Sequence, residues 1–314
     1  MKRFLTTTLL ALLAGCASNV PLTPPVAAPV IAAPAPLAPV VPPAAPLAAT
    51  EPQLRFDHSL ASLNQSSRVR FIIIHYTVAD LDRSIMLLTQ KDVSVHYLLT
   101  DTPQPFIYTL VDENRAAWHA GTSSWKNFSQ LNNSSIGIEI VNPGYTDTPE
   151  GRVWTPFAQA QIDQLIPLVK QIAARHGVAP ENILGHNEIA PQRREDPGPL
   201  FPWKQLAEAG LVPWPDEAQV AAQRQVYEQR LPDIKWFQQQ LAQHGYMTPQ
   251  TGVLDKATRN VLIAFQMRYR PSKFDGVPDA ESAALLQVVN AIPPTPSPPP
   301  VAIPASIPSP AAVH

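Results

Sequence analysis

The sequence is poor in the residues that mark disulfide-stabilised or strongly charged proteins. Cys16 is the single cysteine among 314 residues, so no disulfide can form within the chain, and the fold depends on its core and on any metal it binds. Charged residues make up only 15% and the formal net charge is −2, which gives no electrostatic case for binding nucleic acid. The apolar run from Phe4 to Leu13 is too short for a transmembrane helix.

Proline is plentiful instead, with 37 residues that gather largely in two segments. Residues 20–53 are dominated by Pro, Ala and Val and carry almost no charge, so they cannot build a packed core. They predict an extended, semi-rigid tether, whose reach at about 3 Å per residue is roughly 100 Å. Residues 291–314 are also Pro-rich and predict a disordered tail.

The N-terminal residues predict how such a tether would be attached. Residues 1–3 are basic at two positions, an apolar run follows, and Leu13-Ala14-Gly15-Cys16 places small residues before the cysteine. This pattern resembles a bacterial lipobox, which implies a signal peptide over residues 1–15 and acylation of Cys16 at the start of a 16–53 linker. Ala17, where an Asp would signal inner-membrane retention, favours the outer membrane, with the protein facing the periplasm. The alternative is an ordinary secretory signal with an incidental cysteine.

The run from His186 to Asp196 is the most informative stretch of the chain. It reads His-Asn-Glu-Ile-Ala-Pro-Gln-Arg-Arg-Glu-Asp and continues into Pro197-Gly198-Pro199. Its prolines fix the backbone and remove donors, so the run predicts a rigid loop and no helix. A stiff loop can present His186 and Asp196 to one metal ion at a reduced entropic cost. The intervening Glu188 and Glu195 are expected to be solvated loop charges.

Two strands supply matching groups upstream. Residues 69–74 form a β-branched and aromatic run that ends at His75, where the rim of a sheet is expected. A second strand, 135–141, puts Glu139 among apolar neighbours, where burial would raise its pKa toward that of a general base. Two His and one carboxylate leave a fourth position open on tetrahedral zinc, which is the catalytic pattern. A lone strand histidine is nevertheless more often a hydrogen-bonded core residue.

Five motifs, taken in order, resemble those of the zinc-dependent type 2 N-acetylmuramoyl-L-alanine amidases. The resemblance covers residues 54–215, and the arrangement of lipoprotein signal, catalytic domain and helical C-terminal domain resembles the AmiD-type outer-membrane members. The motifs are Ile-Ile-Ile-His-Tyr-Thr at 72–77, Val-Ser-Val-His-Tyr at 93–97, Ala-Trp-His-Ala-Gly at 117–121, Ser-Ile-Gly-Ile-Glu at 135–139 and Gly-His-Asn-Glu-Ile-Ala-Pro at 185–191.

The resemblance implies roles for individual residues. The family's three ligands to a single zinc ion fall on His75, His186 and Asp196, and its general base falls on Glu139. The family often has Lys two residues before the last ligand, whereas this chain has Arg194. Arginine stays protonated in proteins, so Arg194 can stabilise an oxyanion but cannot serve as a proton donor.

The resemblance also implies the reaction, which is hydrolysis of the lactyl amide between N-acetylmuramic acid and L-alanine in peptidoglycan or muropeptides. Trp118 and His119 would line the substrate cleft, although packing is the alternative for His119. Two other functions compete: a non-catalytic peptidoglycan-binding lipoprotein, and a structural lipoprotein that links membrane to wall. The complete set of ligands and base favours the enzyme, and the sequence indicates no obligate protein partner.

Residues 217–290 predict a second, helical unit. Ile234, Phe237 and Leu241 recur at helical spacing, as do Val261 and Phe265. The unit resembles the small three-helix peptidoglycan-binding domain, except that Thr-Gly-Val-Leu-Asp at 251–255 replaces the usual Asp-Gly turn. The alternative is a packing domain that only buttresses the catalytic one.

The predicted fold is therefore α/β, with a mixed central sheet flanked by helices, followed by a small all-α domain. Strands are expected near 69–74, 93–100, 106–111 and 135–141, and covering helices near 80–91 and 156–176. A catalytic domain of this length can hold a self-sufficient core.

Overall fold

The computed structural model describes residues 54–57, 59–60, 62 and 64–295. The predicted signal peptide, the whole 16–53 linker with Cys16, and most of the C-terminal tail lie outside these residues. The chain up to Ala61 and the chain from Ser62 onward form separate units, and all elements named below belong to the second unit. Among the described residues, no helix is both long and apolar enough to cross a membrane.

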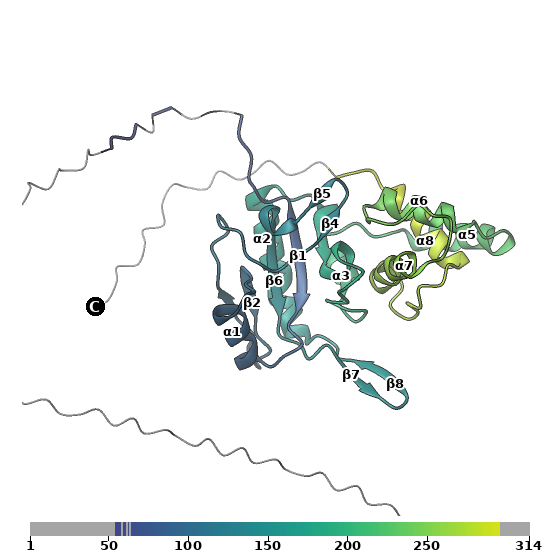
Figure 1. The fold of residues 1–314 in the computed structure, drawn as a ribbon, viewed down its shortest axis with the longest axis horizontal. Coiled ribbons are helices and arrows are strands. Elements are labelled where there is room, and N and C mark those ends of the chain that lie inside the picture. Colours follow the sequence, from purple (N-terminus) through teal and green to yellow (C-terminus); the bar gives the residue numbers. More distant parts are fainter. Residues whose placement is uncertain (1–53, 58, 61, 63, 296–314) are drawn as a thin grey trace, which may run out of the picture. The chain divides into compact units, whose positions relative to one another are not determined.

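The centre of the fold is a five-stranded mixed sheet (Figure 1). Its order is β3-β2-β6-β1-β9, and every neighbouring pair is parallel except β2 with β3. The mixed central sheet predicted from the sequence is thus confirmed, with one additional short strand. The strands are β1 (Phe71–Tyr76), β2 (Tyr97–Leu99), β3 (Ile107–Thr109), β6 (Ser135–Ile140) and β9 (Ile183–Gly185).

β2 is shorter than the strand predicted over 93–100. His96 N still donates to Gly137 O of β6 at 3.2 Å, but Ser94 N donates to Trp118 O at 3.2 Å and not to a neighbouring strand. This contact fixes the Trp118 segment beside the sheet. The fifth strand, β9, has three residues and is too short to show a period-2 pattern.

The side chains of β1 alternate between two hydrophobic cores. Ile72 and Ile74 pack in a core that includes Ile162, Leu165 and Val169 of α2 (Gln159–His176). Phe71 and Ile73 point to the opposite face and belong to a second core. His75 is separated from Phe71 and Ile73 by an even number of positions along the strand, so its side chain lies on the same face as the second core.

That second core is shared with the C-terminal helices. Phe237, Leu241 and Phe265 of these helices pack in the same cluster as Phe71 and Ile73. The helical unit contains four helices, one more than predicted. They are α5 (Glu217–Gln229), α6 (Ile234–His244), α7 (Lys256–Tyr269) and α8 (Ala280–Asn290), and aspartates cap the N-termini of all four.

The remaining elements are short or lie at the edges. α1 (Leu81–Gln90) is N-capped by Asp80, whose carboxylate accepts a hydrogen bond from Arg83 N at 2.8 Å. The others are β4 (Ser124–Trp125), β5 (Phe128–Ser129), η1 (Leu131–Ser134), β7 (Tyr145–Thr148), β8 (Gly151–Trp154), η2 (Pro180–Asn182) and α4 (Trp203–Glu208).

The predicted loop at 186–196 needs a correction. Its first four residues form α3 (His186–Ile189), a single helical turn, so the expectation of no helix was wrong for these positions. The prolines restrict the backbone only from Pro191 onward. The turn is capped by its own Glu188, whose Oε2 accepts a hydrogen bond from Gly185 N at 2.7 Å.

Candidate active site

His75, His186 and Asp196 converge although they come from different parts of the chain. His75 lies on β1, His186 opens α3, and Asn187 N donates to Asp196 O at 2.8 Å, which folds the loop back onto α3. His75 Nδ1 lies 3.0 Å from His186 Nδ1 and 3.0 Å from Asp196 Oδ2, and His186 Nδ1 lies 3.1 Å from the same oxygen. All three residues are buried, so the sequence-predicted ligands form one cluster.

A chain of hydrogen bonds determines which nitrogen of His75 is free. Ser135 Oγ donates its hydrogen to Leu131 O at 2.6 Å, so it accepts from His119 Nε2 at 3.1 Å. His119 Nδ1 then carries a lone pair and accepts from His75 Nε2 at 3.0 Å. His75 therefore presents the lone pair of Nδ1 to the cluster.

Gly137 makes this arrangement possible. A Cβ atom at Gly137 would lie 2.5 Å from Cγ of His119, so only glycine lets the imidazole ring lie against β6. His186 is oriented in a similar way, because its Nε2 donates to Ala120 O at 3.2 Å and leaves Nδ1 free. Burial, and next the neighbouring His186, lowers the pKa of His75 to about 4, so the ring is neutral at pH 7.

The geometry of the three donors fits a small cation. Two unprotonated imidazole nitrogens and a carboxylate oxygen that lie 3.0–3.1 Å apart repel one another unless a positive charge lies between them. Two zinc–ligand bonds of 2.0–2.1 Å at a tetrahedral angle place their ligand atoms about 3.3 Å apart, which is close to the observed spacing. Two histidines and one carboxylate are also a donor set typical of zinc.

Glu139 lies beside the cluster because of the strand register. β1 pairs with β6 in parallel, and His75 is directly opposite Glu139, so both side chains project from the same face. Among the described residues, the buried Oε2 of Glu139 has no hydrogen-bond partner. Burial, and next the charge of Asp196, raises the pKa of Glu139 to about 8. The sequence-based expectation of a raised pKa therefore agrees with the structure.

These groups line a cavity of about 170 Å³. Trp118 lies on its wall with a side chain that is 64% exposed, and His119 and Arg194 line it as well. Arg194 also lines a neighbouring cavity of about 420 Å³, whose far wall is formed by Asn260 and Ile263 of α7. The structure thus brings every sequence-predicted site residue except Cys16 to one place.

The sequence analysis missed the residues that support the cluster. Ser135 orients His119, and Arg193 donates hydrogen bonds to Ala120 O and to Thr122 O, holding the 120–122 segment against His186. The signal that could have revealed the first contact was the glycine inside the strand at 137. Glu188 was expected to be solvated, but it is 1% exposed and pairs with Arg268, so that expectation was wrong.

Comparison with known proteins identifies both parts of the chain. Residues 65–199 match the family model described as N-acetylmuramoyl-L-alanine amidase, and residues 230–286 match that of a putative peptidoglycan binding domain. The second match covers α6, α7 and the first part of α8, whereas α5 lies before it. The chain is 42% identical over 233 residues to the N-acetylmuramoyl-L-alanine amidase AmiD of Escherichia coli, covering 71% of this chain and 82% of that protein.

Two solved structures show the same architecture. The complex of E. coli AmiD with anhydro-N-acetylmuramic acid-L-Ala-D-γ-Glu-L-Lys matches with a TM-score of 0.68 at 40% identity, covering 74% of this chain and 93% of that chain. AMPDH3 of Pseudomonas aeruginosa matches with a TM-score of 0.70 at 36% identity, covering 76% and 98%. The coverage includes both the sheet domain and the helices. The chain therefore belongs to the N-acetylmuramoyl-L-alanine amidase family and is a type 2, AmiD-like member.

Proposed function

We propose that this protein hydrolyses the amide bond between N-acetylmuramic acid and L-alanine in peptidoglycan or muropeptides. One zinc ion would be held by His75, His186 and Asp196, with Glu139 as general base. The observation that carries the proposal is the convergence of the three donor atoms in one cavity with Glu139, whose Oε2 has no hydrogen-bond partner in the described part of the chain. The substrate class follows from the family, and from the muropeptide bound in the AmiD structure.

When bound, zinc supplies a Lewis acid that polarises the scissile carbonyl and lowers the pKa of a coordinated water. Glu139 would accept the proton of the attacking water and deliver it to the leaving L-alanine nitrogen. The raised pKa of Glu139 suits a group that both takes and returns a proton near neutral pH. Arg194 would stabilise the negative charge that develops on the carbonyl oxygen.

The cavity walls suggest how substrate is held. The exposed indole of Trp118 offers a flat apolar surface beside the site, and His119 orients His75 by accepting a hydrogen bond from its Nε2. We therefore assign substrate contact to Trp118, and to His119 chiefly the orientation of a ligand. The helical unit is proposed to bind peptidoglycan, which the match to the peptidoglycan-binding model supports.

The domain organisation and location are proposed on the sequence. Residues 1–15 would be a lipoprotein signal peptide, Cys16 the acylated residue, 16–53 the linker, 54–215 the amidase domain, 217–290 the helical domain and 291–314 the tail. The protein would then act at the periplasmic face of the outer membrane. Cys16→Ser should abolish acylation, because the acyl chains are the proposed anchor. Recovery of this variant in the membrane fraction after a high-salt wash would contradict the proposal.

The activity is tested with purified protein lacking residues 1–16, a disaccharide or anhydromuramyl peptide, and mass spectrometry of the products. We expect release of the intact stem peptide from the lactyl group, loss of this activity with chelator, and recovery on adding zinc. His75→Ala, His186→Ala and Asp196→Ala should each lose both zinc and activity, since three protein ligands leave none to spare. Binding of the substrate without cleavage by zinc-loaded protein would instead support a non-catalytic binding protein.

A further inference from the structure

The segment that carries His186 has little regular secondary structure of its own. α3 is a single turn, and a helix of this length is not stable without tertiary contacts. The strand before it, β9, is at the edge of the sheet and pairs only with β1 through three residues. The position of His186 therefore depends on tertiary contacts, which come from β1 and β4 of its own domain and from α7 of the helical domain.

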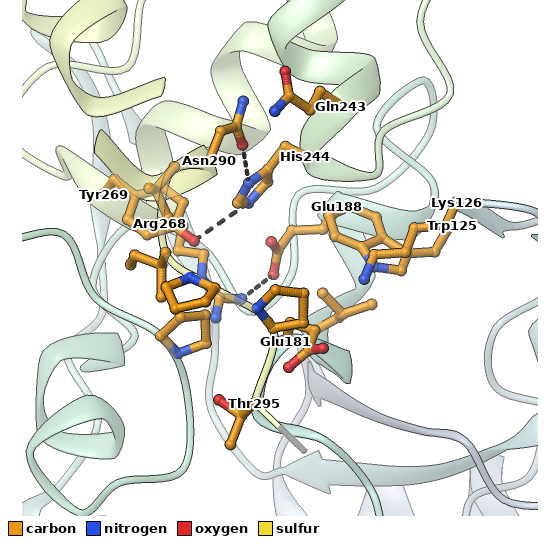
Figure 2. A pocket seen from close by; sticks show the side chains of 16 residues that line it. Trp125, Lys126, Glu181, Glu188, Gln243, His244, Arg268, Tyr269, Asn290 and Thr295 are labelled. Carbon is orange, nitrogen blue, oxygen red and sulfur yellow. Dashed lines mark hydrogen bonds and ion pairs between the residues drawn. The ribbon is translucent and has the colours of Figure 1, made fainter. Parts of the chain in front are cut away.

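Arg268 of α7 contacts this segment on both sides of the ligand. Its Nη1 donates to Glu188 Oε2 on α3 at 2.7 Å (Figure 2). The same Nη1 donates to Ile183 O on β9 at 3.2 Å, so the two acceptors lie on either side of His186 in the chain. The guanidinium stacks on the ring of Trp203 at 4.0 Å, which fixes its plane. An edge-strand carbonyl that would otherwise lack a partner is thereby satisfied.

Glu188 transmits this contact to the backbone that precedes His186. The oxygen that accepts from Arg268 also accepts from Gly185 N at 2.7 Å, and Tyr246 OH donates to the other oxygen at 3.4 Å. Glu188 is 1% and Arg268 3% exposed, so both charges are removed from water. A buried ion pair contributes little to stability compared with a well-packed apolar pair, so stability alone does not account for it. It does impose one geometry on the residues that it joins.

The same helix also contacts the middle of the 186–196 loop, at Gln192. Gln192 Nε2 donates to Ala257 O at 3.0 Å, and Asn260 Nδ2 donates to Gln192 Oε1 at 3.0 Å. α7 thus touches the loop before His186, after it, and shortly before Asp196. His186 therefore lies between two contacts made by the helical domain, and Asp196 follows four residues after a third.

We propose that Arg268, acting through Glu188, is a positioning residue for the metal site, so that the C-terminal helical domain completes the geometry of the catalytic centre in addition to binding the cell wall. The inference rests on the proposed zinc site. It predicts that zinc affinity depends on a side chain that touches neither metal nor substrate, and that the 183–196 segment becomes more mobile when that side chain is shortened.

The test compares Arg268→Gln and Arg268→Lys with the native protein by chelator-competition measurement of the zinc Kd and by hydrogen–deuterium exchange of the metal-free protein. Arg268→Gln should weaken zinc binding by about 10- to 100-fold, the usual effect of removing a group that orients a ligand. It should also speed exchange in residues 183–196. Arg268→Lys keeps the charge but loses the planar guanidinium that stacks on Trp203, so we expect an intermediate Kd.

Arg270→Gln is the matched control. Arg270 is also buried near the end of α7, but its Nη1 pairs with Asp279 at 2.8 and 2.6 Å inside the helical domain and does not contact residues 183–196. This variant should lower the unfolding temperature while leaving the zinc Kd and the exchange of 183–196 unchanged. If Arg268→Gln does not fold, Arg268→Lys carries the comparison.

The outcomes separate the two proposals. An unchanged zinc Kd and unchanged exchange in Arg268→Lys or Arg268→Gln would overturn the positioning role, as would an equal loss of affinity in Arg270→Gln. Failure of the native protein to bind zinc would overturn the proposed metal site itself. In that case the exchange measurement on the metal-free protein still shows whether Arg268 orders the segment.

Discussion

Replacing Glu139 with glutamine should inactivate the enzyme and at the same time stabilise its metal-free form. The variant keeps the shape of the side chain but cannot accept a proton, so turnover should fall by about 10²- to 10⁴-fold with zinc still bound. The stabilisation follows from the environment of the carboxyl, which is buried next to Asp196 and has an oxygen without a partner among the described residues. Ionising such a group in the folded state is unfavourable.

The size of the effect follows from the pKa of Glu139. Its ordinary value is 4.5 and burial raises it to about 8, so between these two pH values the folded protein keeps a proton that the unfolded chain has lost. Stability must then fall as pH rises through this window, by about 1.4 kcal/mol per pH unit for a fully buried group. At pH 7 this amounts to about 3 kcal/mol, and partial exposure of Glu139 reduces it to about 2–3 kcal/mol.

Glutamine does not titrate, so Glu139→Gln does not lose this stability as the pH rises. Compared with native protein treated with chelator, Glu139→Gln should unfold at a temperature higher by roughly 5–10 °C at pH 7. The difference should be near zero at pH 4.5, grow through pH 7 and level off above pH 8. Thermal unfolding followed by circular dichroism at several pH values measures it, and the other titrating groups cancel in the comparison.

Zinc provides the internal control. A bound cation favours the ionised carboxylate, so the advantage of Glu139→Gln should shrink when both proteins are loaded with zinc. The reasoning would be refuted if the unfolding temperatures of Glu139→Gln and the metal-free native protein differed by the same amount at pH 5 and pH 8. It would also be refuted if the variant were less stable than the native protein at pH 7. Either result would mean that the Glu139 carboxylate is well solvated or paired in the folded protein.

Three further predictions concern the cavity walls. Arg194→Ala should keep zinc and lower kcat. It should also move the acid limb of the pH–rate profile to higher pH, because the charge of Arg194 lowers the pKa of Glu139. Arg194→Lys should restore much of the rate. His119→Leu should weaken zinc binding by about 10- to 100-fold in chelator competition, since His75 loses the acceptor for its Nε2 hydrogen. Trp118→Ala should raise KM more than it lowers kcat in steady-state assays, because it removes an exposed contact surface.

The sequence predicted the ligands because their signals are local. His75 follows a run of β-branched residues, and His186 and Asp196 lie in one short segment that contains prolines. Glu139 could be paired with His75 because both lie in strands of one sheet, although the register that places them opposite each other is visible only in the structure. The chemistry of the centre was therefore accessible from the residues themselves.

What the sequence could not show depends on contacts between distant segments. Glu188 has the neighbours of a solvated loop charge, and its burial requires Arg268, which lies 80 residues further along the chain. The short β9 and α3 carry no periodicity of their own, since they are held by β1 on one side and α7 on the other. A local sequence pattern does not predict an element that is stabilised by contacts with another domain.

The same physical effect explains why the exposure of Glu188 was predicted wrongly and why Glu139 suits the role of general base. Glu139 and Glu188 are both acidic residues placed where an isolated carboxylate is unfavourable. Glu188 escapes the penalty by pairing with Arg268, and it thereby fixes the strand–helix junction that carries His186. Glu139 has no such partner among the described side chains, which suits its proposed role as general base. Pairing Glu139 with a cation of the protein would make the fold more stable and remove the base, so the same burial that lowers stability at this site is what the proposed reaction requires.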